Sequence, residues 1–429
     1  MTDVLRFDSA RAGDAPRWAA GVRVSTDGSQ VTAALVAAGG SGMGLRPRVV
    51  EAVAAPLPSS VAGLLGAVDG PASGLKPSEL TETILAVRSQ LAEIGASVVE
   101  SLLAQAGLPP GRVLAVGVHD PGLWSSPHGA QVSCLNLCDA AVLAELSGQN
   151  VIDAFPARDL ARGGQGGPVT PLAQWVLLRH RIEHRLLVDL GRTVRVTYLP
   201  PETSGRCGTP VLCFDVGPGT RLLDLLARRL SEGRHPFDPG GSLAVQGRRI
   251  EALVEHWLAD PYFRRPLPRW HPRGVRPERF LVEAVQMAID RGWSIRDLLC
   301  TATHFVARSI GLAVRHRLPD GVKIDEVVLA GGGQQNGMLL RELAAELPDV
   351  SLVRIADLGI DSDALEPACI AILALFHVDQ VPANRPEITG AEVARVLGRL
   401  TPGSPQSWQR LLAQMGASRP EVRPLRSAL

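Results

Sequence analysis

Two β-hairpin patterns, one near the start of each half of the chain, constrain the fold most strongly. Residues 21–38 alternate apolar and polar side chains on either side of Asp27-Gly28, and an Asp-Gly pair supplies the positive φ values of a tight turn. Residues 185–200 repeat this arrangement with a glycine in the turn. After each hairpin, apolar strands alternate with helical patterns, which favours an α/β fold made of two related lobes.

The spacing of apolar residues predicts the other elements. Apolar side chains recur at three- and four-residue steps over 77–107, which is typical of a long helix. Residues 58–76 are rich in Gly, Pro, Ser and Ala and predict a loop. Extended segments are expected at 46–55, 113–119, 150–154 and 351–359, helices at 139–146, 250–263, 278–317 and 363–377, and strand–turn–helix units at 209–230 and 324–347.

The length and charge of the chain limit its organisation and its partners. A chain of 429 residues is expected to form two or three domains, and we predict an N-terminal lobe at 18–168, a C-terminal lobe at 169–400 and a tail at 401–429. The 44 basic and 43 acidic residues give a net charge of +1, so neither nucleic acid nor a membrane is an expected partner. No apolar run is long enough for a membrane span, the first residues lack a signal-peptide pattern, and cysteines are sparse. We therefore expect a soluble, cytoplasmic protein.

Four turns rich in glycine or aspartate follow predicted strands, at 25–28, 189–193, 215–220 and 331–333. Glycine lets a ligand approach the backbone closely, and free N–H groups at such turns favour phosphate. Aspartates at strand ends suit Mg²⁺. Together the turns predict two hairpin tips that clamp a Mg-nucleotide between the lobes, although each turn alone also fits ordinary turn chemistry. No Walker A glycine–lysine signature is present, which argues against a P-loop enzyme.

Asp159 is the candidate general base. It lies in FPARDLARGGQGGP (155–168), between a predicted strand and a glycine-rich loop, where an aspartate that faces a cleft would accept a proton. The alternative is a structural role, either as a helix cap or in an ion pair with Arg158. The residue types in this segment leave both interpretations open.

Five sequence blocks, ARDLARGGQGGP, FDVGPGTRLLD, DPYF, LAGGGQQN and SDALE, occur in this order between about Gly21 and Val378. In these blocks the chain resembles the anhydro-N-acetylmuramic acid kinases, a family of the sugar kinase, heat-shock protein and actin superfamily. The resemblance implies a two-lobed, actin-like or hexokinase-like ATPase fold of duplicated RNase H-like domains with an interlobe cleft. It also implies ATP and Mg²⁺ as cofactors, a small amino sugar as substrate, and a homodimer, because members of the family are commonly dimers.

In the reaction that the resemblance implies, water opens the anhydro ring of an amino sugar from peptidoglycan turnover, and the freed 6-oxygen is phosphorylated. Its catalytic base would fall on Asp159. The nucleotide-binding positions would be Ser25, Asp27, Gly28, Asp189, Gly191, Asp215, Gly217, Gly219, Gly331, Gly332 and Gly333. His119 and Glu366 would lie at the sugar, and Asp27 and Asp189 at Mg²⁺.

Departures from the family pattern leave two functional hypotheses open. The second glycine loop carries Arg192 and Arg195 where the family has glycine and asparagine. These arginines would either add contacts to phosphate or fill the space that phosphate needs. We therefore consider both an active sugar kinase and a catalytically degenerate paralogue that binds sugar or nucleotide without turnover. An α/β hydrolase or dehydrogenase is disfavoured, because neither G-x-S-x-G nor a G-x-G-x-x-G after the first strand is present.

Overall fold

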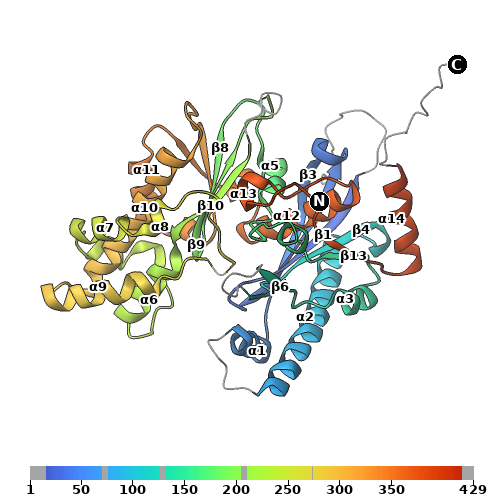
Figure 1. The fold of residues 1–429 in the computed structure, drawn as a ribbon, viewed down its shortest axis with the longest axis horizontal. Helices are drawn as coiled ribbons and strands as arrows, with labels where there is room; N and C mark the ends of the chain where they lie inside the picture. Colours follow the sequence, from blue (N-terminus) through green and yellow to red (C-terminus); the bar gives the residue numbers. More distant parts are fainter. Residues whose placement is uncertain (1–15, 70–75, 126–131, 204–209, 273, 418–429) are drawn as a thin grey trace.

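The computed structural model describes residues 16–69, 76–125, 132–203, 210–272 and 274–417, which are organised around two large sheets (Figure 1). The first sheet has the strand order β13-β7-β4-β1-β2-β3, and the second has the order β10-β9-β8-β11-β12. The first contains β1 (Arg17–Val24), β2 (Gln30–Gly39), β3 (Arg46–Pro56), β4 (Val113–His119), β7 (Val151–Asp153) and β13 (Arg399–Thr401). The second contains β8 (Arg185–Leu190), β9 (Thr193–Leu199), β10 (Leu212–Pro218), β11 (Glu326–Ala330) and β12 (Ser351–Arg354).

The two sheets repeat one topology. In the first, β1, β2 and β3 form an antiparallel meander, while β1 pairs in parallel with β4, and β4 with β7. In the second, β8, β9 and β10 form the same meander, while β8 pairs in parallel with β11, and β11 with β12. The repeat confirms the predicted two-lobed α/β fold of duplicated domains.

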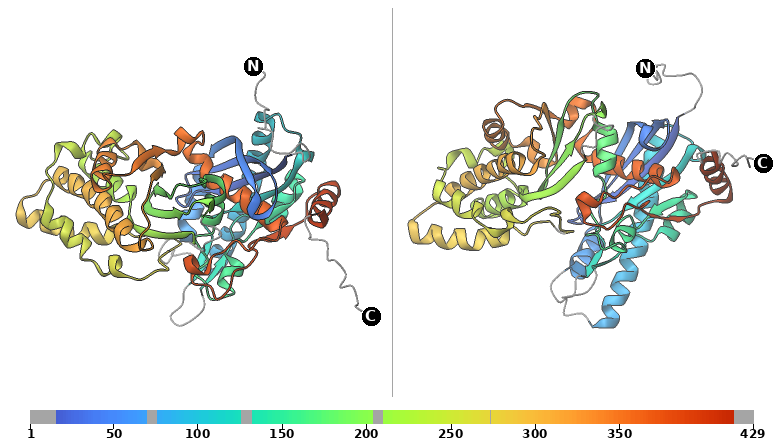
Figure 2. Two further views of the ribbon diagram at one scale, coloured as in Figure 1. Left: turned by 90° about the horizontal axis from the view of Figure 1, so that it is seen from above. Right: turned by 45° about the horizontal axis from the view of Figure 1, so that its top comes forward.

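Helices cover the faces of both sheets, as the views in Figure 2 show. Those packed on the first sheet are α1 (Ser59–Asp69), α2 (Pro77–Gln105), α3 (Ala140–Ser147), α5 (Pro171–Leu178), α12 (Ser362–Val378) and α14 (Pro405–Ala417). Those of the second lobe are α6 (Thr220–Leu230), α7 (Glu251–Leu258), α8 (Pro261–Arg264), α9 (Glu278–Arg291), α10 (Ile295–Arg317) and α11 (Gly337–Glu346). Among the described residues, no helix combines the length and the apolar composition needed to cross a bilayer.

α12 lies between the two sheets because it shares one apolar core with both. That core contains Ala19 of β1, Leu187 of β8 and nearly all of the apolar residues of α12. The helix also approaches the first sheet at two glycines: a Cβ at Gly21 would lie 1.9 Å from the Pro367 carbonyl oxygen, and one at Gly117 would lie 2.6 Å from that of Ile370. Only glycine fits at these two positions, and the middle of α12 therefore packs directly on β1 and β4.

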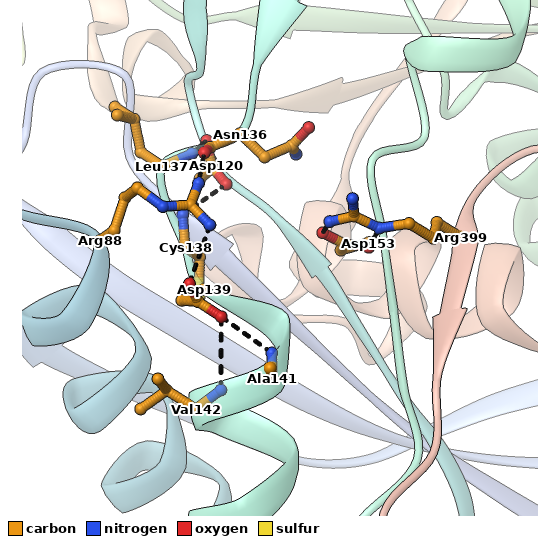
Figure 3. A network of polar contacts seen from close by, with 10 residues as sticks. All are labelled: Arg88, Asp120, Asn136, Leu137, Cys138, Asp139, Ala141, Val142, Asp153 and Arg399. Atoms are coloured by element: carbon orange, nitrogen blue, oxygen red, sulfur yellow. Dashed lines mark hydrogen bonds and ion pairs between the residues drawn. The ribbon is translucent and has the colours of Figure 1, made fainter. Parts of the chain in front are cut away.

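A polar network ties the end of β4 to the helices of the first lobe (Figure 3). The buried Asp120 carboxylate, directly after β4, accepts hydrogen bonds from three backbone N–H groups. Asp139 caps the N-terminus of α3 and pairs with Arg88 of α2 at 2.9 Å. Arg399 of β13 forms a two-point ion pair with Asp153 of β7. The Asp120 hydrogen bonds fix the chain directly after β4, and the two ion pairs join α2 to α3 and β13 to β7.

The structure differs from the sequence-based expectations at both ends of the first lobe. The segment predicted as a loop at 58–76 contains α1, because Val61 and Leu65 are buried against the first sheet and α2. The chain also returns to this lobe at its C-terminal end, since β13 pairs with β7 and Leu411 of α14 is buried in the core around α12. Residues 399–417 therefore lie with the first lobe and not in a separate tail, and residues 418–429 of the predicted tail lie outside the described part of the chain.

Candidate functional site

The turns at the tips of the first hairpin of each lobe face one another. Arg192, in the β8–β9 turn, places its Nη1 atom 3.3 Å from Oδ2 of Asp27 in the β1–β2 turn. The side chains are 45% and 37% exposed, respectively. The structure therefore brings the first two predicted phosphate-binding turns together at the junction of the lobes.

The β1–β2 turn is held by its own side chains. The Ser25 hydroxyl accepts hydrogen bonds from the Ser29 and Gln30 N–H groups, and Gly28 has a φ of +67° that suits glycine. Oδ1 of Asp27 accepts hydrogen bonds from the hydroxyl and the N–H of Ser29. Although burial raises the pKa of Asp27, these hydrogen bonds and the charge of Arg192 outweigh it, so the pKa lies below its usual value. The turn thus presents a stable negative charge.

Three glycine turns of the second lobe pack directly against each other. A Cβ at Gly219 would lie 2.2 Å from the Gly191 carbonyl oxygen, and one at Gly331 would lie 2.5 Å from Oδ1 of Asp189. Gly333 packs on the strand β8 in the same way, whereas Gly332 faces open space. The predicted positions in these turns therefore pack together, and Gly332 is the position among them where an added Cβ would meet open space.

The start of α6 is tied to the β8–β9 turn. The N–H of Gly219 donates to the Arg192 carbonyl and the N–H of Thr220 to the Gly191 carbonyl, each at 2.9 Å. Gly217 lies further back, where a Cβ would meet the ring of Phe263. Two backbone donors that could have bound phosphate are therefore already used, and the guanidinium group of Arg192 is the positive group that remains at this turn.

Charged side chains connect the predicted nucleotide position Asp189 with the predicted sugar positions Glu366 and His119 through electrostatic interactions. Burial and the charge of Glu366 raise the pKa of Asp189 to about 6, against the opposing charges of Arg195 and Arg23. Burial and the charge of Arg23 lower the pKa of His119 to about 4, so this imidazole is neutral at pH 7. Glu366 therefore acts electrostatically on both Asp189 and His119.

Sequence reasoning missed Arg23 in this group. It is opposite His119 in the parallel β1–β4 register, and an arginine that interrupts the apolar residues 18–24 was the available signal. Sequence reasoning also missed Gln174, which orients Glu366: its Nε2 donates to Oε1 of Glu366 at 3.1 Å, while its Oε1 accepts a hydrogen bond from Thr197. Among the described residues, no donor is recorded for Oε2 of Glu366.

Asp215 lies beside this group in a buried ion pair. Its Oδ1 accepts a hydrogen bond from Nε of Arg195 at 2.9 Å, and its Oδ2 accepts one from the His271 N–H at 3.2 Å. The Asp215 side chain is 1% exposed. In this structure its carboxylate therefore orients Arg195 and the segment around His271, and a nucleotide would reach it only if this pair opened.

Asp159 does not occupy the open position predicted for it. It lies in the short helix α4 (Ala157–Leu160) with no exposed surface. Oδ2 accepts a hydrogen bond from the Gly166 N–H, and Oδ1 accepts hydrogen bonds from the Thr389 hydroxyl and the Asn384 amide. The expectation that this carboxylate faces a gap is corrected here, because a segment more than 220 residues away folds over it.

The acidic residues suit a metal ion only in part. The described residues contain no cluster of three or more His, Cys, Asp or Glu side chains placed to hold a metal. Asp27 is engaged by Arg192, whereas the described residues donate no recorded hydrogen bond to the carboxylate of Asp189. Mg²⁺ commonly takes one or two carboxylates and completes its shell with phosphates and water, so Asp189 fits such an ion when a nucleotide is present.

Duplicated α/β lobes, with glycine turns that meet at their junction and charged side chains behind them, define a protein of the two-lobed sugar kinase and actin type of ATPase fold. The sequence model of the anhydro-N-acetylmuramic acid kinase family matches residues 21–403. The chain therefore belongs to this family.

Curated relatives agree with this assignment over nearly their whole lengths. The chain is 34% identical over 394 residues to the anhydro-N-acetylmuramic acid kinase of Gloeobacter violaceus, covering 90% of this chain and 99% of the relative. It is 32% identical over 378 residues to the protein of the same name from Acaryochloris marina, covering 88% and 97%, respectively.

Proposed function

We propose that the chain is an ATP-dependent kinase of 1,6-anhydro-N-acetylmuramic acid that acts in the cytoplasm in peptidoglycan turnover. The observation that carries this proposal is the family match over residues 21–403, in a structure whose first two glycine turns face each other through Asp27 and Arg192. In the reaction, the oxygen of water bonds to the anomeric carbon and the bond from that carbon to the 6-oxygen breaks. The 6-oxygen then takes the γ-phosphoryl group, and ADP leaves.

The nucleotide would lie along the glycine surface. We assign its phosphates to the space between the β1–β2 and β8–β9 turns, where Arg192 supplies positive charge, and its adenosine to the turn at Gly332, which faces open space. Asp189 would hold Mg²⁺, which when bound neutralises the charge on the phosphates. Asp27 would leave Arg192 when the phosphates enter.

Glu366 takes the role of proton acceptor in this proposal. Asp159 has no exposed surface in this structure, so an attacking water would reach it only if the segment of Asn384 and Thr389 that covers it moved. Glu366 is partly exposed, is oriented through one oxygen by Gln174, and has no recorded donor on the other among the described residues. His119 stays neutral because its pKa is about 4, so it would contact the sugar without competing for the proton.

The test is turnover in a coupled assay for ADP, with mass spectrometry of the sugar. We expect ADP release that needs Mg²⁺ and is stimulated by the anhydro sugar, and a product that has gained both water and a phosphoryl group. Glu366→Gln should slow turnover at least about 100-fold, the lower end of general-base contributions. Asp363→Asn is the matched control, because Asp363 is an exposed carboxylate on the same helix.

Two outcomes would contradict the proposal. If the anhydro sugar does not raise ADP release above the sugar-free rate, the chain is not this kinase and the non-catalytic paralogue becomes the better hypothesis. If the Glu366→Gln and Asp363→Asn variants both turn over at the full rate, the kinase activity is supported, but Glu366 is not the proton acceptor.

A further inference from the structure

Arg23, near the end of β1, carries a positive charge that the structure leaves without a partner. The residue is partly buried, and no hydrogen bond or ion pair of its guanidinium group is recorded among the described residues. By contrast, Arg192 and Arg195 are each paired with an aspartate. Burying a charge without a partner costs free energy, so an unpaired guanidinium group at the junction of the lobes calls for an explanation.

The packing of α12 along β1 determines where the side chain of Arg23 points. At the start of β1, Arg17 pairs with Asp379, which directly follows α12. Four residues further along the strand, a Cβ at Gly21 would lie against the Pro367 carbonyl, near the other end of the helix. The strand and the helix therefore run in opposite directions, and Arg23 lies at the start of α12. Because alternate residues of a strand share a face, its side chain points to the side of the sheet that α12 covers, as Gly21 does.

The charge of Arg23 acts on both halves of the proposed site. His119, its neighbour in the β1–β4 register, lies on the same face of the sheet, because Gly117, two residues before it, also packs on α12. Burial and the charge of Arg23 lower the pKa of His119. The same charge opposes the rise in the pKa of Asp189 that burial causes. The guanidinium group therefore lies within electrostatic reach of a position assigned to the sugar and of one assigned to the nucleotide.

The segments around Arg23 favour a phosphoryl group as its partner. Two residues further on, Ser25 begins the β1–β2 turn, which we assigned to the phosphates. Ser362, the first residue of α12, accepts a hydrogen bond from the Gly331 N–H at 2.9 Å, so the glycine turns of the second lobe adjoin the same end of this helix. Glu366, the proposed proton acceptor, follows one turn later. A phosphoryl group that moves from the nucleotide to the sugar therefore passes the guanidinium group.

We propose that Arg23 contacts the γ-phosphoryl group while this group is transferred from ATP to the 6-oxygen of the sugar. The proposal rests on the proposed function. In this step the bond between the γ-phosphorus and the β–γ bridging oxygen breaks, its electron pair leaves with ADP, and the 6-oxygen bonds to the phosphorus. Arg23 loses no proton, and its charge stabilises the oxygens that carry negative charge during the transfer. Arg192 binds the phosphates before the transfer, so the two arginines have separable effects.

The experiment compares Arg23→Met, which removes the charge and keeps an unbranched side chain, with Arg23→Lys, which keeps the charge. Rapid-quench measurement of a single turnover on the full chain gives the rate of the transfer itself. We expect Arg23→Met to slow the transfer about 100-fold or more, the scale of one lost donor at a developing charge, and Arg23→Lys to slow it less. The KM values for ATP and for the anhydro sugar should change by less than about threefold, because the contact matters mainly during the transfer.

A second measurement does not depend on turnover. Aluminium fluoride bound with ADP and Mg²⁺ mimics a phosphoryl group in transfer, and a residue that contacts this group tightens the binding of the mimic. In titration calorimetry, Arg23→Met should lower the affinity for this mimic about tenfold or more and leave the affinity for ADP alone unchanged. Arg112→Ala is the matched control, because Arg112 is an exposed arginine next to the start of β4, whereas His119 ends that strand.

The outcomes separate this proposal from the proposed function. Transfer by Arg23→Met at the wild-type rate or faster, or an unchanged affinity for the mimic, would overturn the role of Arg23 and leave the kinase in place. A higher KM for the sugar at an unchanged transfer rate would assign Arg23 to sugar binding and also overturn it. A rate that falls only in proportion to the folded fraction in urea unfolding would show a structural role instead. If the wild type releases no ADP in response to the sugar, the proposed function fails and this proposal fails with it.

Discussion

Asp27 and Arg192 form an ion pair across the junction of the lobes, with 3.3 Å between Oδ2 and Nη1. Each residue belongs to the tip of the first hairpin of its own lobe. Because both side chains are well exposed, the pair contributes little to stability. It instead marks the point at which an entering triphosphate must replace one carboxylate as the partner of the guanidinium group.

Replacing Arg192 should therefore affect nucleotide binding and not folding. We expect Arg192→Ala to raise KM for ATP about tenfold, the scale of a charge-assisted hydrogen bond, and to change the free energy of unfolding by less than about 1 kcal/mol. Steady-state kinetics and urea unfolding measure the two quantities, with Arg229→Ala as the control. A KM that stays the same or falls would mean that Arg192 obstructs the phosphate position.

The stability of the protein should depend on Asp189 in a pH-dependent way. Its pKa is raised from 3.8 to about 6 in the folded state, so the folded state binds this proton more tightly than the unfolded state does. The Asp189 side chain therefore does not lower the free energy of unfolding below about pH 4. Its destabilising effect grows as the pH rises and becomes constant above about pH 6. Asp189→Asn should stabilise the protein by up to about 3 kcal/mol at pH 8, from the size of the pKa shift.

Urea unfolding of the Asp189→Asn variant at pH 4 and at pH 8 checks this prediction. Stabilisation of equal size at both values would show that the gain has another cause. The same variant should bind Mg-ATP more weakly, because the proposed metal ligand is lost.

The burial of Asp159 predicts a structural role for that carboxylate. Asp159→Asn replaces one carboxylate oxygen, which accepts hydrogen bonds, with an amide NH₂ group, which donates them. The site offers this group only donors, namely the Thr389 hydroxyl, the Asn384 amide and the Gly166 N–H. We expect a loss of about 2–4 kcal/mol in the free energy of unfolding, as for unsatisfied buried groups, while the folded fraction should turn over at nearly the normal rate. If turnover instead slowed by about 100-fold or more with unchanged stability, Asp159 would be restored as the base.

The pair of Arg195 and Asp215 should be coupled in stability. Removing one partner leaves a buried charge, so Arg195→Met should cost about 3–5 kcal/mol. Asp215→Asn added to Arg195→Met should recover part of this loss, because no charge then remains unpaired. A double-mutant cycle in urea unfolding measures the coupling, and additive losses would show that the ion pair does not exist in solution.

Patterns of neighbouring residues were sufficient to predict the turns, strands and helices that depend mainly on local interactions. Asp27-Gly28 marked a tight turn, and the observed β1 and β2 lie on either side of it. The strand at 113–119 and the helix that begins at residue 77 were predicted from apolar spacing and occur there. The blocks that resemble the family also identified it correctly.

Long-range packing determined the helix α1 and the burial of Asp159, which local patterns did not predict. α1 forms because Val61 and Leu65 find an apolar surface, although their segment is rich in residues typical of loops. Asp159 is enclosed because Asn384 and Thr389 fold over it.

The amino-acid sequence alone thus determined the two hairpins, the alternation of strands and helices and the family, since each depends on neighbouring residues or on the order of motifs along the chain. Only the tertiary structure decided which carboxylates are buried and that the C-terminal strand β13 joins the first sheet. The physical reason is that burial and charge compensation depend on side chains that are distant in sequence and meet only after folding.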